Sequence, residues 1–134
     1  MKATPAMYVH DTKETPYAVQ IVQNLKPIET RTRNVLKRFV GERVLVIRTR
    51  SGHPADVVGE ATIMNSRFYT AAELDAMRNL TRIPEGSKYD CTGKGKWCYW
   101  LADAVQYDEP IPLADYQIIT RTMSYAILTS KESK

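Results

Sequence analysis

The chain has 134 residues, of which 43% are hydrophobic and 25% are charged, and its formal net charge at pH 7 is +4. This composition is typical of one globular domain, and we expect that domain over residues 1–128, with an unstructured polar tail over residues 129–134. No apolar run approaches the roughly 20 residues that cross a bilayer, and the N-terminus lacks the apolar segment of a secretory signal. These absences predict a cytoplasmic protein with no membrane partner.

The first half of the chain predicts a short helix set among strands. Residues 7–11 have the composition of a short strand, and the apolar spacing from Pro16 to Leu25 is near the helical period. Residues 28–33 alternate as a strand does. The β-branched run over residues 43–49 predicts the clearest strand of the chain. Residues 51–56 are rich in turn formers and predict a loop.

The second half predicts further strands and one more helical segment. Thr70 and Glu73 form a capping box that opens a helix, and Gly59 marks a bulge or a close backbone approach. Residues 81–96 predict a long loop, and the extended segment 110–113 cannot be a central strand because of its prolines. Strands are expected over residues 57–65, 97–105 and 118–128. Many strands with two or three short helices indicate the α+β class, with a curved, mostly antiparallel sheet or small β-barrel.

The positive charge is concentrated in the first half. Eight Lys or Arg residues lie between Lys26 and Arg50, against two glutamates. Such a distribution is compatible with a phosphate-bearing partner, and the alternative is an ordinary solvated surface. The segment begins with Lys26, Glu29 and Arg31, and strand alternation puts Glu29 and Arg31 on one face. A lysine beside a carboxylate can serve as nucleophile or base plus acid, and the three together can receive an anion. The alternative is a structural ion-pair network.

Four further residues are candidates for ligand binding. Arg48 and Arg50 end the best strand and can contact phosphate. Trp97, like Tyr99 and Trp100, can stack on a base, although one face of the strand 97–105 must belong to the core. Tyr17 is the fourth candidate. We expect no cofactor and no metal site, because the histidines and cysteines have no metal-ligand spacing. The two cysteines are expected to be free thiols.

The pattern Lys26-x-x-Glu29-x-Arg31, followed by residues 57–61, Lys96 to Leu101 and Ile111-Pro112, resembles the ASCH domain, a family with a PUA-like β-barrel fold. The resemblance runs from about residue 7 to about residue 112. It implies a cleft between barrel and helix, lined by Lys26, Glu29 and Arg31, that receives RNA or a modified nucleoside. Some relatives are acetylcytidine amidohydrolases that use a lysine, a threonine and a glutamate, and others resemble ribonucleases.

Two departures from that family pattern concern the site. Glu29 stands where the amidohydrolases have threonine, and Asn24 stands where the family usually has glycine. From its position in the sequence alone, we assign Glu60 to the catalytic glutamate of the amidohydrolases.

Three functions follow as hypotheses. The first is binding of RNA or a modified nucleoside at Lys26, Glu29 and Arg31. The second is a hydrolase on a modified nucleoside or an RNA phosphodiester, with Lys26 as base or nucleophile, Glu29 as proton carrier and Arg31 as clamp. The third is a non-catalytic regulatory or interaction domain.

Overall fold

The computed structural model describes residues 2–131, which form a seven-stranded sheet with short helices. The strands are β1 (Thr4–His10), β2 (Ile28–Arg31), β3 (Arg43–Arg50), β4 (His53–Thr70), β5 (Gly95–Pro112), β6 (Tyr116–Arg121) and β7 (Tyr125–Ser130). The helices are α1 (Tyr17–Val22), α2 (Ala71–Asp75) and α3 (Arg78–Thr81), with 3-10 turns η1 (Lys37–Phe39) and η2 (Leu113–Asp115).

The sheet has the strand order β2-β5-β4-β3-β1-β7-β6. The β1–β3 pair is parallel, and the other five neighbouring pairs are antiparallel. This arrangement confirms the α+β class with mostly antiparallel strands and short helices.

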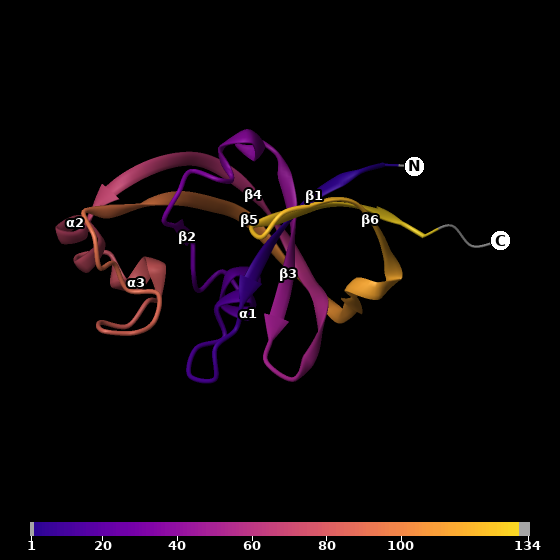
Figure 1. Cartoon of the computed structure of the whole chain (residues 1–134), viewed down its shortest axis with the longest axis horizontal. Helices are drawn as coiled ribbons and strands as arrows, with labels where there is room; N and C mark the ends of the chain where they lie inside the picture. Colours follow the sequence, from indigo (N-terminus) through magenta and orange to yellow (C-terminus); the bar gives the residue numbers. More distant parts are fainter. Residues whose placement is uncertain (1, 132–134) are drawn as a thin grey trace.

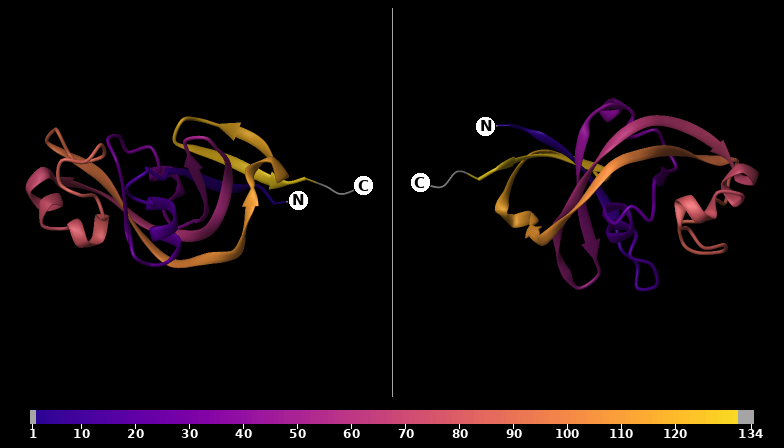
Figure 2. Two further views of the ribbon diagram at one scale, coloured as in Figure 1. Left: turned by 90° about the horizontal axis from the view of Figure 1, so that it is seen from below. Right: turned by 180° about the vertical axis from the view of Figure 1, so that it is seen from behind.

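The long strands β4 and β5 arch over the molecule (Figure 1). Register shifts interrupt their pairing at three points, and such irregularities increase local twist and bending. In both views of Figure 2, α2 and α3 lie at one end of the arch and the β6–β7 hairpin lies at the other.

The helix α1 packs under the sheet and completes the main core. Its residues Tyr17, Ala18, Ile21 and Val22 are buried against strand residues of β1, β3, β4 and β5. Gly59 allows this packing, because a Cβ there would lie 2.1 Å from the Val105 carbonyl oxygen and 2.7 Å from a Val22 methyl. The close approach predicted at Gly59 is therefore confirmed.

Several predicted boundaries in the first half are corrected. The helix expected from Pro16 to Leu25 covers only Tyr17–Val22. The loop expected over residues 51–56 is wrong, because β4 begins at His53 and only Ser51 and Gly52 form the turn. Long-range pairing with β3 extends the strand through a segment whose local composition favours turns.

Other corrections fall in the second half. The capping box at Thr70 is present, but the helix that it opens, α2, is short, and a second short helix, α3, follows in place of one longer helix. The single strand expected over residues 118–128 is two strands, β6 and β7, joined by a turn at 122–124. Residues 110–112 belong to β5. Ile111 and Pro112 pair with β4, and they lie on the stretch of β5 that β2 does not reach.

The unstructured tail expected over residues 129–134 is wrong at its first two residues. Thr129 and Ser130 belong to β7, and residues 132–134 lie outside the described part of the chain.

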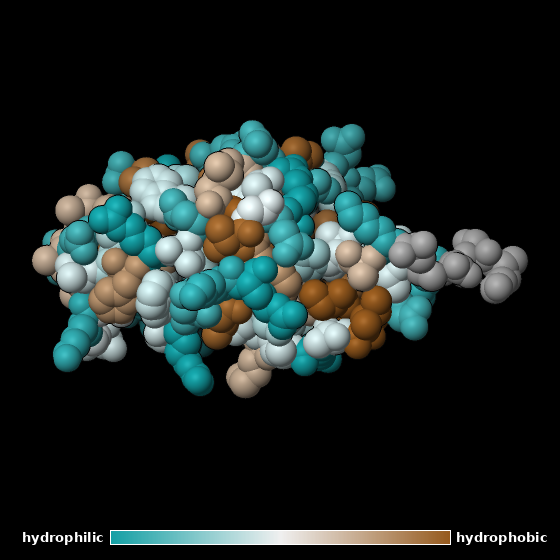
Figure 3. Space-filling model, turned by 90° about the horizontal axis from the view of Figure 1, so that it is seen from above, coloured by the Kyte–Doolittle hydropathy of each residue, from teal (hydrophilic) through white to brown (hydrophobic). Residues whose placement is uncertain are grey.

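None of the helices described is long and apolar enough to cross a membrane. The face of the molecule seen from above is mainly hydrophilic, and its hydrophobic side chains form separate patches (Figure 3).

Candidate functional site

The end of α1 determines where Lys26 lies. Asn24 has a φ of +62°, a left-handed conformation that asparagine tolerates better than most residues. The backbone N–H groups of Leu25 and Lys26 then donate to the Gln20 carbonyl at 2.8 and 3.1 Å. Asn24 therefore adopts a conformation that glycine also adopts readily, and the chain turns from α1 into β2 with Lys26 at the junction, as predicted.

Lys26 is almost completely buried, with 1% of its surface exposed. Its ammonium group donates to the Thr81 carbonyl, lies 3.7 Å from Glu29 Oε1, and lies 5.2 Å from the centre of the Tyr17 ring. Burial lowers the pKa of Lys26 from 10.5 to about 8, while the charge of Glu29 acts in the opposite direction. The side chain is therefore a cation at neutral pH that releases its proton far more readily than a surface lysine does.

Glu29 and Arg31 lie on one face of β2, as their spacing predicted. Arg31 donates from Nε (3.1 Å) and Nη2 (2.8 Å) to Glu29 Oε2. It also donates to the carbonyls of Tyr8 (2.6 Å) and Ser124 (3.5 Å). Arg31 thus connects the edge strand β2 to β1 and to the β6–β7 turn across the inside of the curved sheet.

These residues line a cavity of about 960 Å³. Its walls come from β1, the α1–β2 junction, β2, residues 83–89, the start of β5 and the β6–β7 turn, and they include the predicted Tyr17. Tyr17 is buried and meets Tyr89 edge to face at 5.8 Å. The structure therefore brings together Tyr17, Lys26, Glu29 and Arg31, four of the residues that the sequence indicated.

Lys96 also lines this cavity, and sequence reasoning missed it. It ends the segment 92–96, which contains two glycines and two lysines but lacks the spacing of a phosphate-binding P-loop. The sequence signal that could have indicated Lys96 is its position directly before a strand rich in aromatic residues. Lys96 is 8% exposed, and its ammonium group donates to the Tyr89 carbonyl. Burial lowers the pKa of Lys96 as well.

The remaining predicted residues lie away from the cavity. Arg48 forms a two-pronged ion pair with Asp56, at 2.9 and 2.6 Å, and Arg50 lies 3.9 Å from the same carboxylate. Trp97 is half-buried and packs edge to face on Phe68. None of these three predicted ligand contacts lines the cavity.

Glu60 also lies away from the cavity. It accepts hydrogen bonds from Arg43 (2.7 Å) and from the Tyr107 hydroxyl (2.7 Å), and it does not line the cavity. The positional assignment of Glu60 as a catalytic glutamate therefore receives no support from the geometry.

Within residues 2–131, no cluster of three or more His, Cys, Asp or Glu side chains is arranged to hold a metal ion. Cys91 and Cys98 are free thiols, as expected. Burial raises the pKa of Cys98 to about 11, so this thiol stays protonated at neutral pH.

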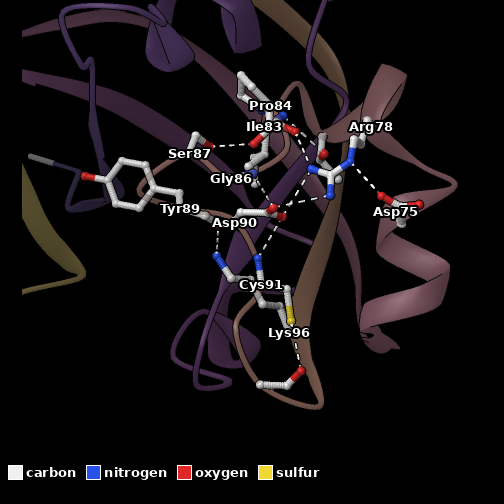
Figure 4. A network of polar contacts seen from close by, with 12 residues as sticks. Asp75, Arg78, Ile83, Pro84, Gly86, Ser87, Tyr89, Asp90, Cys91 and Lys96 are labelled. Atoms are coloured by element: carbon white, nitrogen blue, oxygen red, sulfur yellow. Dashed lines mark hydrogen bonds and ion pairs between the residues drawn. The ribbon is translucent and has the colours of Figure 1, made fainter.

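A polar network holds the wall segment that carries Tyr89 (Figure 4). Arg78 donates to both carboxylate oxygens of Asp90 (3.1 and 3.3 Å) and to the Ile83 carbonyl (2.9 Å). Asp90 also accepts from the backbone N–H of Gly86 at 2.8 Å. This network stabilises the turns between α3 and β5, and so it fixes the carbonyl group that Lys96 contacts.

The fold is that of an ASCH domain, of the PUA-like class, as the residue pattern predicted. The crystal structure of the ASCH protein from Zymomonas mobilis superposes with a TM-score of 0.67 at 20% identity, over 95% of this chain and 87% of that chain. Its Ser-to-Ala variant gives 0.65, at 20% identity over 95% and 88%. Its Tyr-to-Phe variant gives 0.64, at 20% identity over 81% and 76%. No protein-family model matches the sequence, and no curated protein matches it significantly.

Proposed function

We propose that this protein binds RNA or a modified nucleoside by taking one nucleoside unit into the cavity at Lys26, Glu29 and Arg31. The observation that carries the proposal is the cavity itself, about 960 Å³ in volume with charged groups buried in its wall. Ligand pockets usually measure about 300–1,000 Å³, so a nucleoside fits with room for a neighbouring group.

The wall offers the contacts that a nucleoside needs. Tyr17 and Tyr89 provide apolar and aromatic surface, and Lys26 provides a buried donor beside the acceptor Glu29. A donor and an acceptor close together suit the polar edge of a base. The ASCH-like fold and the Lys-x-x-Glu-x-Arg pattern support the same assignment.

The test is direct binding of short single-stranded RNAs and of nucleosides, including acetylcytidine, to the wild type and to Lys26→Ala. We expect the substitution to weaken binding at least tenfold, and RNA binding to weaken as salt rises, because phosphate contacts release counterions. Lys37→Ala is the matched control, because Lys37 is exposed on η1 and carries the same charge outside the cavity. If no RNA or nucleoside binds, or if both variants lose affinity equally, the proposal fails.

A hydrolase acting on the bound nucleoside or on an RNA phosphodiester is the second candidate. The observation that favours it is a lysine with a pKa of about 8 located 3.7 Å from a carboxylate. A general base works best when its pKa is near the working pH. Lys26 would take a proton from the attacking water, or would itself attack the acyl or phosphoryl group with water then releasing that group, and Glu29 would carry the proton to the leaving amine or oxygen. Arg31 has most of its donors on Glu29 and on backbone carbonyls, so it is better suited to orienting Glu29 than to clamping substrate.

The hydrolase candidate is tested by incubating the protein with acetylcytidine and with RNA, and following acetate, cytidine or shortened RNA by chromatography. Lys26→Ala should abolish turnover while the circular dichroism spectrum stays unchanged. Turnover that survives this substitution would reject the assigned role. If neither binding nor turnover is found, the charged cluster is structural and the third hypothesis, a non-catalytic regulatory or interaction domain, is favoured.

A further inference from the structure

Lys96 is a buried cation without a carboxylate partner. It is the second residue of β5, it is 8% exposed, and it lines the same cavity as Lys26. Across residues 2–131, no Asp or Glu oxygen lies within 4.0 Å of its ammonium group. Lys26, by contrast, has Glu29 at 3.7 Å. A desolvated charge without a counter-charge is costly, so the group favours an anion from outside the protein.

The charge balance of the cavity leads to the same conclusion. Among the described lining residues, Glu29 is the single carboxylate, and it is shared by Arg31 and Lys26. The buried or half-buried cations that line the cavity are Lys26, Arg31 and Lys96. With both lysines protonated, these four groups together carry a net positive charge. An electropositive cavity concentrates anions, and a charged donor strengthens their hydrogen bonds.

The geometry around Lys96 is preorganised. One of its three N–H donors is used by the Tyr89 carbonyl, and within residues 2–131 the other two have no protein acceptor. The Tyr89 carbonyl is itself held in place by the Arg78–Asp90 network (Figure 4). A donor fixed in this way binds an anion without first losing much conformational freedom.

We propose that Lys96 anchors a phosphate group, so that the ligand of this cavity is a phosphate monoester of a nucleoside rather than an uncharged nucleoside. The inference rests on the proposed function and adds the substrate class to it. The monoester can belong to a free nucleotide or to the end of an RNA strand, since the recognised group is the same. Lys26 and Glu29 would then meet the nucleoside part, next to the phosphate.

The experiment is isothermal titration of the wild type, Lys96→Met and Lys94→Met. The titrants are the four ribonucleosides and acetylcytidine, the 5′-monophosphate of each, inorganic phosphate, and one short RNA with and without a 5′-phosphate. Lys94 is the matched control, because it is an exposed lysine two residues away in the same segment. Methionine keeps much of the length of the side chain and removes its charge. Lys96→Gln repeats the test with a polar side chain, in case the methionine variant does not fold.

We expect at least one monophosphate to bind tenfold or more tightly than its nucleoside. This preference should disappear in Lys96→Met and Lys96→Gln and persist in Lys94→Met. The RNA arm distinguishes the two sources, because a 5′-phosphate effect on RNA with none on free nucleotides identifies the strand end as the ligand. A preference for free monophosphates upholds the phosphate site, and so does a 5′-phosphate effect seen on RNA alone.

Three results separate the failure of this inference from the failure of the proposed function. Equal binding of nucleosides and their monophosphates, with no 5′-phosphate effect on RNA, overturns the role of Lys96 and leaves the proposed function standing. Inorganic phosphate that binds the wild type but not Lys96→Met, with no nucleoside or nucleotide bound, upholds the anion site and rejects the proposed function. If no titrant binds, including phosphate, both are overturned.

Discussion

The burial of Lys26 predicts a specific dependence of stability on pH. In the folded protein its pKa is lowered from 10.5 to about 8. Because a pKa difference of one corresponds to about 1.4 kcal/mol, the protonated lysine costs the folded state roughly 3 kcal/mol below pH 8. Between pH 8 and pH 10.5 the unfolded chain holds this proton and the folded protein does not. The contribution of Lys26 to the free energy of unfolding therefore rises with pH in that window.

The measurement compares the wild type with Lys26→Met in urea denaturation at several pH values. Methionine has a similar length and does not titrate, and the loss of the hydrogen bond to the Thr81 carbonyl adds an offset that does not depend on pH. We expect the stability of the wild type, relative to the variant, to increase by about 2 kcal/mol between about pH 6.5 and about pH 9.5. The raised pKa of Cys98 has the opposite effect above pH 9, and the comparison with the variant removes that effect except for the part that the charge of Lys26 contributes to the pKa of Cys98.

A difference that is flat with pH, or that decreases as pH rises, would refute the reasoning, because it would mean that Lys26 is solvated or fully compensated in the folded protein. The control is Lys37→Met, at an exposed lysine on η1. Its stability difference from the wild type should not change over the same pH range.

Three further substitutions and one control test the packing of the site and of the core beneath the sheet. Glu29→Gln leaves the buried Lys26 and the half-buried Arg31 without their counter-charge, so urea denaturation at pH 7 should give a loss of about 3 kcal/mol; a loss below about 1 kcal/mol would contradict this. Gly59→Ala places a Cβ 2.1 Å from the Val105 carbonyl oxygen, and it should lower the free energy of unfolding by about 3 kcal/mol or prevent folding. Gly93→Ala has nothing within 4 Å of the new Cβ and should leave the melting temperature unchanged. Tyr99→Phe removes a buried hydroxyl that joins β5 to the loop after β2, and thermal denaturation should reveal a loss of about 2 kcal/mol.

Local patterns predicted much of the fold and part of the site. Strand alternation put Glu29 and Arg31 on one face, and the structure pairs them directly. The capping box at Thr70 forms as expected because both of its hydrogen bonds are local. The elements most often misjudged were those whose extent depends on a distant partner. For example, β3 extends β4 back to His53 in spite of a turn-forming composition.

The candidate site shows the same difference between features set by local sequence and features set by distant partners. The sequence by itself determined that Lys26 stands at a helix–strand junction and that Glu29 and Arg31 follow on one face, since these relations depend only on local periodicity. It did not reveal that Asp56 neutralises Arg48, because that contact joins neighbouring strands through a bulged register. Nor did it reveal Lys96 in the cavity wall. Burial and charge pairing depend on which surfaces meet when the sheet curves, so only the tertiary structure decided which of the lysines and arginines line the cavity.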